Sequence, residues 1–114
     1  MMQQTTRIEF KARLSEAILR FAVWAKGEGI PNYDPRVWRR DRYGNPIRFL
    51  DYGNRASTYG WEIDHIVPVA RGGDEALSNK QPLHWAVNVV KSDKTVLPRK
   101  NAVGNQWDTT RAVG

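Results

Sequence analysis

Both histidines of this 114-residue chain lie in one segment, residues 61–94. Asp64 directly precedes His65 at the end of an apolar run, so the pair offers a carboxylate oxygen for a metal ion and an imidazole that can accept a proton. His84 and Asn88 follow, four residues apart. On a helix they would share a face and could both reach one ion. These residue types and spacings are typical of a metal-dependent hydrolytic site.

A strand, a loop, a second strand and a helix must position these side chains. The sequence predicts a strand that ends at Pro68, a tight turn at Gly72-Gly73, an extended piece over 81–83 and a helix over about 84–94. Because side chains alternate along a strand, Asp64 and His65 would point to opposite faces. We therefore expect a distortion at the strand end that brings them together.

An amphipathic helix is predicted ahead of this segment, over about 7–26. Thr6 followed by Glu9 has capping-box spacing, and apolar residues recur at helical intervals until Gly27. The apolar stripe consists of Leu14, Ala17, Ile18, Phe21, Ala22 and Ala25. We expect this stripe to cover the sheet that follows, with helix-mediated dimerisation as the alternative.

A basic hairpin is predicted over residues 36–50, between breaks rich in proline and glycine. Its arginines are Arg36, Arg39, Arg40, Arg42 and Arg48. Arginines this close together repel one another unless an anion neutralises them, so we predict that they contact nucleic-acid phosphates. Trp38, which lies among them, is expected to pack in the hairpin, with base stacking as the alternative.

The composition limits the class of protein further. The net charge of +6 favours a polyanionic partner, and the length suits a single domain, 1–114. Without cysteine, a disulfide framework, a thiolate nucleophile and a cysteine-based zinc ribbon are excluded. The sequence has no membrane-length apolar run and no cleavable signal pattern, so we expect a soluble, cytoplasmic protein. Residues 95–114 have little periodicity and are expected to form a tail.

The pattern D-H-I-x-P-x3-G-G-x5-N-x4-H-x3-N-x2-K begins at Asp64 and ends at Lys91. It resembles the HNH endonucleases, the ββα-metal or His-Me finger nucleases, over about a third of the chain. The resemblance implies an α+β fold, with a ββα-metal core over 61–94. The N-terminal helix and the basic hairpin would pack against this core.

The resemblance also implies roles for individual residues. His65 matches the general base, Asp64 a metal ligand, and Asn88 a second ligand through its amide oxygen. Asn79 matches the residue that pins the loop and holds the base histidine. Glu62 resembles an acidic residue that orients an arginine near the phosphate, although the sequence does not assign that arginine.

Two further positions have alternative interpretations. His84 lies where colicin-type nucleases place a metal-binding histidine, and it is either a ligand or a residue that packs at the helix start. Lys91 is either a phosphate contact or a positive charge near the helix C-terminus.

The expected activity is hydrolysis of DNA phosphodiester bonds with one divalent ion, Mg or Mn, although Co, Ni or Zn would also suit imidazole ligation. The ion would stabilise charge on the phosphate and on the leaving 3′ oxygen while His65 activates water. One site per chain predicts nicking of double-stranded DNA by a monomer or weak dimer, without a membrane. The alternatives are a non-catalytic, metal-stabilised nucleic-acid-binding module and a nuclease for RNA or structured DNA.

Overall fold

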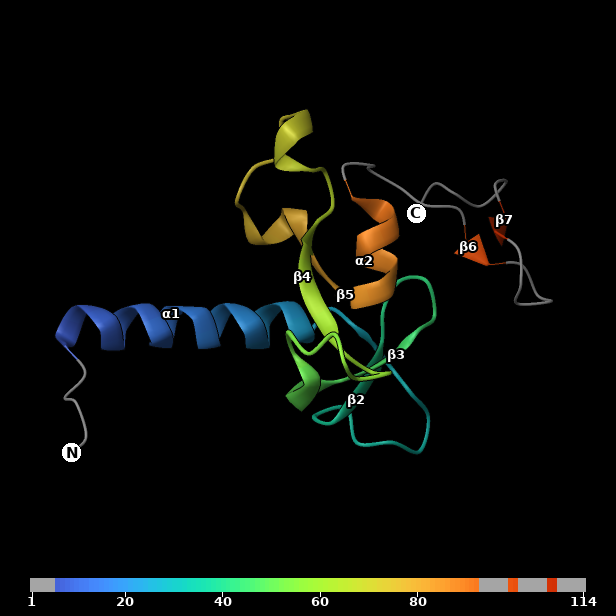
Figure 1. Cartoon of the computed structure of the whole chain (residues 1–114). Helices are drawn as coiled ribbons and strands as arrows, with labels where there is room; N and C mark the ends of the chain where they lie inside the picture. The colour runs from blue at the N-terminus through green and yellow to red at the C-terminus, as the bar shows by residue number, and fades with distance from the viewer. Residues whose placement is uncertain (1–5, 93–98, 101–106, 109–114) are drawn as a thin grey trace.

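The computed structural model describes residues 6–92, 99–100 and 107–108, which form a small α+β fold (Figure 1). The expected α+β class is confirmed. The helices and strands, in chain order, are α1 (Arg7–Trp24), β1 (Glu28–Gly29), β2 (Trp38–Arg40), β3 (Pro46–Arg48), β4 (Trp61–His65), β5 (Lys80–His84), α2 (Trp85–Lys91), β6 (Arg99–Lys100) and β7 (Trp107–Asp108). Strands β1, β2 and β3 form one antiparallel sheet, whereas β4 and β5 form another.

The β4–β5 hairpin and helix α2 follow the predicted order of strand, strand and helix. Asp64 pairs with Gln81 and His65 with Lys80 across the hairpin, and the register is regular along all of β4. The expected distortion of the strand at Asp64 and His65 is therefore not seen. Helix α2 ends at Lys91, earlier than predicted, because Ser92 takes a positive φ of 46° that cannot continue a helix.

The loop between β4 and β5 is folded tightly back on the end of β4. Gly72 has a φ of 89°, which favours glycine. A Cβ atom on Gly73 would lie 1.7 Å from the carbonyl oxygen of Val67, so only glycine fits there. The predicted tight turn at Gly72-Gly73 therefore holds the loop close to the chain that leaves β4.

The predicted basic hairpin contains strands β2 and β3, with Trp38 opposite Arg48. Strand β1, which the sequence did not suggest, pairs with the outer edge of β2. The buried carboxylate of Asp41 organises the turn, where it accepts hydrogen bonds from the backbone N–H groups of Tyr43 and Asn45.

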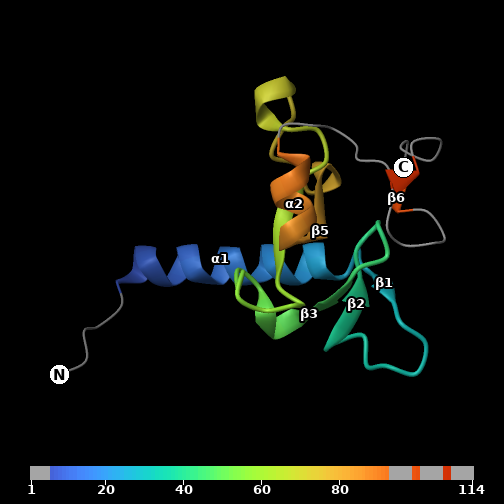
Figure 2. The same ribbon diagram turned by 45° about the vertical axis from the view of Figure 1, so that its right-hand side comes forward.

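The main core lies where the end of α1 meets the sheets. It consists of Val23, Trp24, Ile47 and Trp61, while Leu83 and Val87 form a smaller cluster between β5 and α2. Only the last turns of α1 reach this core, and the rest of the helix extends away from the other elements (Figures 1 and 2).

The expectation that the apolar stripe of α1 covers the sheet is wrong for most of its length. Leu14, Ile18 and Phe21 are 50%, 61% and 60% exposed. The sheets are too small to cover an 18-residue helix, so the contact is limited to its C-terminal end. The capping box of Thr6 and Glu9 forms as predicted.

No helix in the described part of the chain is long and apolar enough to cross a membrane. Of the predicted tail, 95–114, only the short strands β6 and β7 are described, and the rest lies outside the described residues. The end of the predicted second helix, residues 93–94, also lies outside them.

Candidate metal and catalytic site

A single pocket of about 250 Å³ at the end of β4 is lined by Asp64, His65 and Asn88. The first two residues come from β4 and the third from the middle of α2. Although Asp64 and His65 are neighbours on a regular strand, both residues line this pocket. The fold thus brings together the proposed base and the two proposed metal ligands.

The carboxylate of Asp64 is held by two buried partners. Lys91 Nζ lies 3.2 Å from Oδ1 and 3.1 Å from Oδ2, and Gln81 Nε2 donates to Oδ2 at 2.8 Å. Asp64 is 6% exposed and Lys91 is fully buried. An ionised carboxylate can accept about four hydrogen bonds, so these contacts fix Asp64 and still leave it able to bind a cation.

Lys91 lies in the last turn of α2, as one of its two sequence-based interpretations expects. Its ammonium group also donates to the backbone carbonyl of His65, at 2.9 Å, and has no exposed surface. The charge therefore stands near the helix end but is buried, and it is not exposed for contact with a phosphate. It joins α2 to the strand that carries Asp64 and His65.

Asn88 is oriented by Glu62. The amide nitrogen of Asn88 donates to Glu62 Oε1 at 2.8 Å, so the amide oxygen, the atom that can bind a metal, is turned away from that carboxylate. Arg55 binds both oxygens of Glu62, at 2.7 and 3.0 Å. The Arg55 guanidinium and, to a smaller extent, the Asn88 amide hold the pKa of Glu62 below its usual value, against the opposing effect of burial.

Arg55 is the arginine partner of Glu62 that the sequence could not assign. Its side chain is 58% exposed, so the guanidinium is accessible while one face is held by the carboxylate. Seven residues separate the two, across a bend before β4, and no helix or strand spacing indicates such a pair.

His65 is half-buried, and its Nε2 atom contacts the carboxylate of Glu75. A carboxylate can only accept, so Nε2 carries the hydrogen in this contact and Nδ1 of the neutral ring is left as the proton acceptor. Glu75 belongs to the loop between β4 and β5, and no sequence pattern indicates its role. Glu75 lies ten residues after His65 in sequence, and the two side chains meet only because the loop folds back.

Asn79 fixes this loop. Its Oδ1 accepts from the backbone N–H of Val67 at 2.8 Å, and its Nδ2 donates to the carbonyls of Val67 and Asp74, at 3.0 and 2.9 Å. The side chain thus joins the chain just after His65 to the residue just before Glu75. It contacts the loop around His65 and does not contact the ring itself within the described residues.

His84 lies at the start of α2. Its Nδ1 accepts from the backbone N–H of Ala86 at 3.1 Å, and its Nε2 lies 2.6 Å from the carbonyl oxygen of Thr58. Both ring nitrogens are therefore used within the protein, and His84 does not line the pocket of Asp64 and Asn88. Of the two interpretations, the structure favours packing at the helix start.

Three arginines of the hairpin are engaged within the protein. Arg36 and Arg48 form ion pairs with Asp34 and Asp51, each at 2.9 Å, which lower the pKa values of the two carboxylates. Arg39 donates to backbone carbonyls, including that of Gly27 at 2.8 Å. The repulsion that suggested a nucleic-acid anion is therefore relieved by groups of the protein itself.

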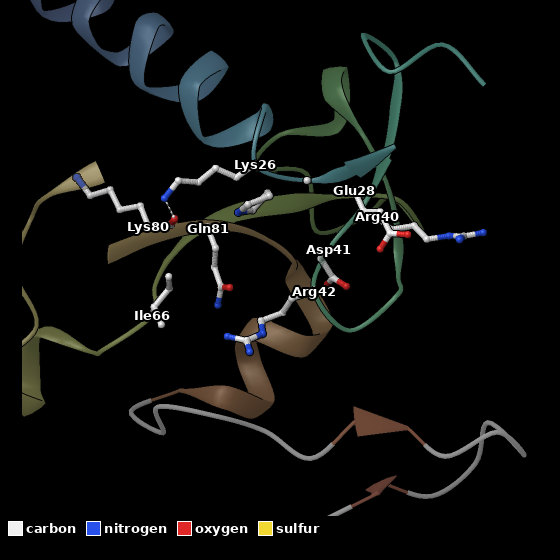
Figure 3. A pocket seen from close by; sticks show the side chains of 10 residues that line it. Lys26, Glu28, Arg40, Asp41, Arg42, Ile66, Lys80 and Gln81 are labelled. Atoms are coloured by element: carbon white, nitrogen blue, oxygen red, sulfur yellow. Dashed lines mark hydrogen bonds between the residues drawn. The ribbon is translucent and has the colours of Figure 1, made fainter. Parts of the chain in front are cut away.

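Arg40 and Arg42 both line a pocket of about 370 Å³ between β5 and the first sheet (Figure 3). In this view Arg42 and Gln81 point toward one another, whereas Arg40 points away from them. Lys26 lies at the edge of the pocket and donates to the carbonyl of Lys80 at 2.6 Å. Gln81, toward which Arg42 points, also binds Asp64.

The donor set at the pocket suits a hard divalent cation. Within the described residues no group of three or more His, Cys, Asp or Glu side chains could hold a metal. A cation would therefore rely on the Asp64 carboxylate, the Asn88 amide oxygen, and water or substrate oxygens. Few protein ligands, all of them oxygen, are typical of Mg, which is often bound by one or two carboxylates plus substrate phosphates.

Residues 54–97 match the family model described as HNH endonuclease. The match covers less than half of the chain and includes β4, β5 and α2. Comparisons with curated proteins and with solved structures found no match. The family resemblance noted from the sequence is therefore confirmed: this segment is consistent with an HNH family member, and the small α+β fold is compatible with an HNH-type fold. The family suggests nuclease activity on a nucleic-acid substrate.

Proposed function

We propose that this protein is a divalent-metal-dependent endonuclease that hydrolyses phosphodiester bonds of double-stranded DNA. The observation that carries the proposal is the shared pocket of Asp64, His65 and Asn88, in a segment that matches the HNH endonuclease family. A base and two oxygen ligands, taken from a strand and a helix, are the parts that such hydrolysis needs.

Asp64 and Asn88 would hold one divalent ion, Mg or Mn. Such an ion, when bound, supplies positive charge that stabilises the developing negative charge on phosphate oxygens. The other contacts of these two residues support this role. Lys91 and Gln81 fix the carboxylate, and Glu62 turns the amide oxygen of Asn88 outward.

His65 acts as the general base through Nδ1. It takes a proton from a water molecule as the water oxygen attacks phosphorus, and the bond between phosphorus and the 3′ oxygen breaks. The leaving oxygen gains a proton from solvent, which gives a 5′ phosphate and a 3′ hydroxyl. Glu75, in contact with Nε2, keeps the ring in the tautomer that leaves Nδ1 unprotonated.

Arg55, Arg40 and Arg42 are the proposed phosphate contacts. Arg55 is exposed and bound to Glu62, which also binds Asn88. Arg42 points toward Gln81, a partner of Asp64 (Figure 3). His84 is assigned to the start of α2 and not to the metal. One such site per chain would nick one strand per event.

Conversion of supercoiled plasmid to open circles in MgCl2 or MnCl2 tests the proposal. His65→Ala should lower the rate by about a hundredfold or more, since general-base catalysis contributes about 10²–10⁴-fold. His84→Ser is the matched control: serine also caps a helix, so this variant should nick at close to the wild-type rate. Equal rates for His65→Ala and wild type would refute the mechanism. Tight DNA binding without nicking by wild type would support the non-catalytic alternative.

A further inference from the structure

A third pocket, of about 400 Å³, lies on the hairpin side of the molecule and is rich in aromatic rings. It is lined by Tyr33, Trp38, Tyr59, Arg40, Pro46 and Ile30. None of the three rings belongs to the buried core clusters. Tyr33 and Tyr59 are 58% and 37% exposed. The packing of the core therefore does not account for these rings.

The rings contact one another edge to face. The centroids of Trp38 and Tyr59 lie 4.8 Å apart with an angle of 87° between the ring planes, and those of Tyr33 and Trp38 lie 6.4 Å apart at 74°. An edge-to-face pair uses the face of only one of its two rings. Ring faces consequently remain for a third planar group that enters the hollow.

The surrounding charge determines what kind of planar group fits. Arg40 lines the hollow, and the guanidinium of Arg48 lies 5.9 Å from the centre of the Trp38 ring. Aromatic cages can hold organic cations, but the guanidinium of Arg40 and the net charge of +6 oppose a cation here. A neutral planar ring with an anionic group attached next to it matches both the aromatic faces and the arginines.

We propose that this pocket binds one unstacked nucleobase of the nucleic-acid substrate, with Arg40 at a flanking phosphate. The proposal rests on the proposed function for the identity of that substrate. Stacking of bases on aromatic side chains tolerates any base, because every base has a planar face. The pocket would thus give the protein a preference for an unpaired nucleotide and not for a sequence.

The pocket lies close enough to His65 to act on the same strand. Tyr59 precedes β4, and His65 is the last residue of that strand. Six residues of extended chain span at most about 20 Å, at about 3.3 Å for each residue. This is the length of about six nucleotides of a strand in B-form DNA, at 3.4 Å each. DNA with an unpaired base within that distance of the cut is therefore the proposed substrate class.

Binding of two short oligomers to the full chain tests the proposal by fluorescence anisotropy. The probes are a fluorescein-labelled oligothymidylate and an abasic sugar-phosphate oligomer of equal length, both with EDTA present so that neither is cut. Wild type should bind the oligothymidylate more tightly. Tyr33→Ala should weaken that binding by about fivefold or more, and leave the abasic oligomer unaffected, because one base loses its stacking partner.

Two variants control for effects other than stacking. Tyr33→Phe keeps the ring and should bind both oligomers as wild type does. Phe10→Ala removes a ring of similar exposure, 61%, from the distant part of α1 and should also leave the preference unchanged. Circular dichroism checks that Tyr33→Ala is folded, as expected for a ring that is mostly exposed.

The possible outcomes distinguish the base pocket from the proposed catalysis. If wild type binds both oligomers equally, or if Tyr33→Ala keeps the full preference, the base pocket is wrong, whatever the nicking assay shows. If the preference is found and depends on Tyr33 but plasmid is not nicked, the base pocket stands and the proposed catalysis fails. If wild type binds neither oligomer, both the base pocket and the proposed nucleic-acid substrate are wrong.

Discussion

Replacement of Lys91 by methionine should destabilise the protein strongly. Lys91 is fully buried and places its charge beside the nearly buried carboxylate of Asp64. Methionine fills a similar volume but has no charge or N–H group. The carboxylate would then stay buried with Gln81 as its partner, and the carbonyl of His65 would lose its donor.

The expected loss follows from these contacts. Removal of one partner of a buried ion pair costs about 3–5 kcal/mol, because the remaining charge is left without compensation. That is a large fraction of the stability of a small domain, which is about 5–15 kcal/mol. Urea denaturation at neutral pH, followed by the fluorescence of the five tryptophans, measures the free energy of unfolding.

A double-mutant cycle separates the ion pair from simple packing. Asp64→Asn removes the negative charge but keeps an oxygen for Gln81, so the Lys91→Met, Asp64→Asn double variant should be more stable than Lys91→Met alone. Lys11→Met, at an exposed position of α1, is the matched control and should change stability by less than about 0.5 kcal/mol. A loss below about 1 kcal/mol for Lys91→Met, or additivity in the cycle, would refute the argument that Asp64 is held as a buried charge.

Two further predictions concern the carboxylates around the site. Glu75→Ala should lower kcat for nicking by about tenfold, with little change in KM. Groups that orient an active-site histidine typically contribute about 10–100-fold, and we expect the lower value because Glu75 is exposed. An unchanged kcat would show that Glu75 does not position His65. Glu62→Gln should destabilise the protein at neutral pH by at most about 1 kcal/mol, because Arg55 is largely exposed. Because the pKa of Glu62 is lowered in the folded protein, its contribution to stability is present at neutral pH and is lost as the pH falls through that pKa. The unfolding free energies of wild type and Glu62→Gln, measured by urea denaturation, should therefore become equal at about pH 2. A difference at that pH as large as the difference at neutral pH would contradict the ion pair.

The sequence predicted the parts of the site that depend on local spacing. The apolar run before Asp64, the glycine pair and the segment around Asn88 each reflect one strand, one turn or one helix. The order of elements in this segment was therefore predictable. The end of α2 was not predictable, because the helix stops at the positive φ of Ser92, and a serine in the sequence does not indicate a positive φ.

Contacts between distant residues were beyond this kind of reasoning. Lys91 lies 27 residues from Asp64, and no periodic pattern connects a lysine near a helix end with a buried carboxylate. The ion pairs of Arg36 and Arg48 were not predicted either, although Asp34 and Asp51 lie only two and three residues away in sequence. The stripe on α1 predicted an amphipathic helix, but amphipathicity does not say how much surface the rest of the fold offers.

The two proposed metal ligands share one physical arrangement: neither depends on its own element for its orientation. Asp64, on β4, is held by Lys91 from α2 and Gln81 from β5, whereas Asn88, on α2, is held by Glu62 from β4. Each bond between the strand and the helix thus fixes a ligand and also joins the two elements. Because groups of the protein itself make these contacts, the fold would position the donors, and little of a cation's binding free energy would be used to order them.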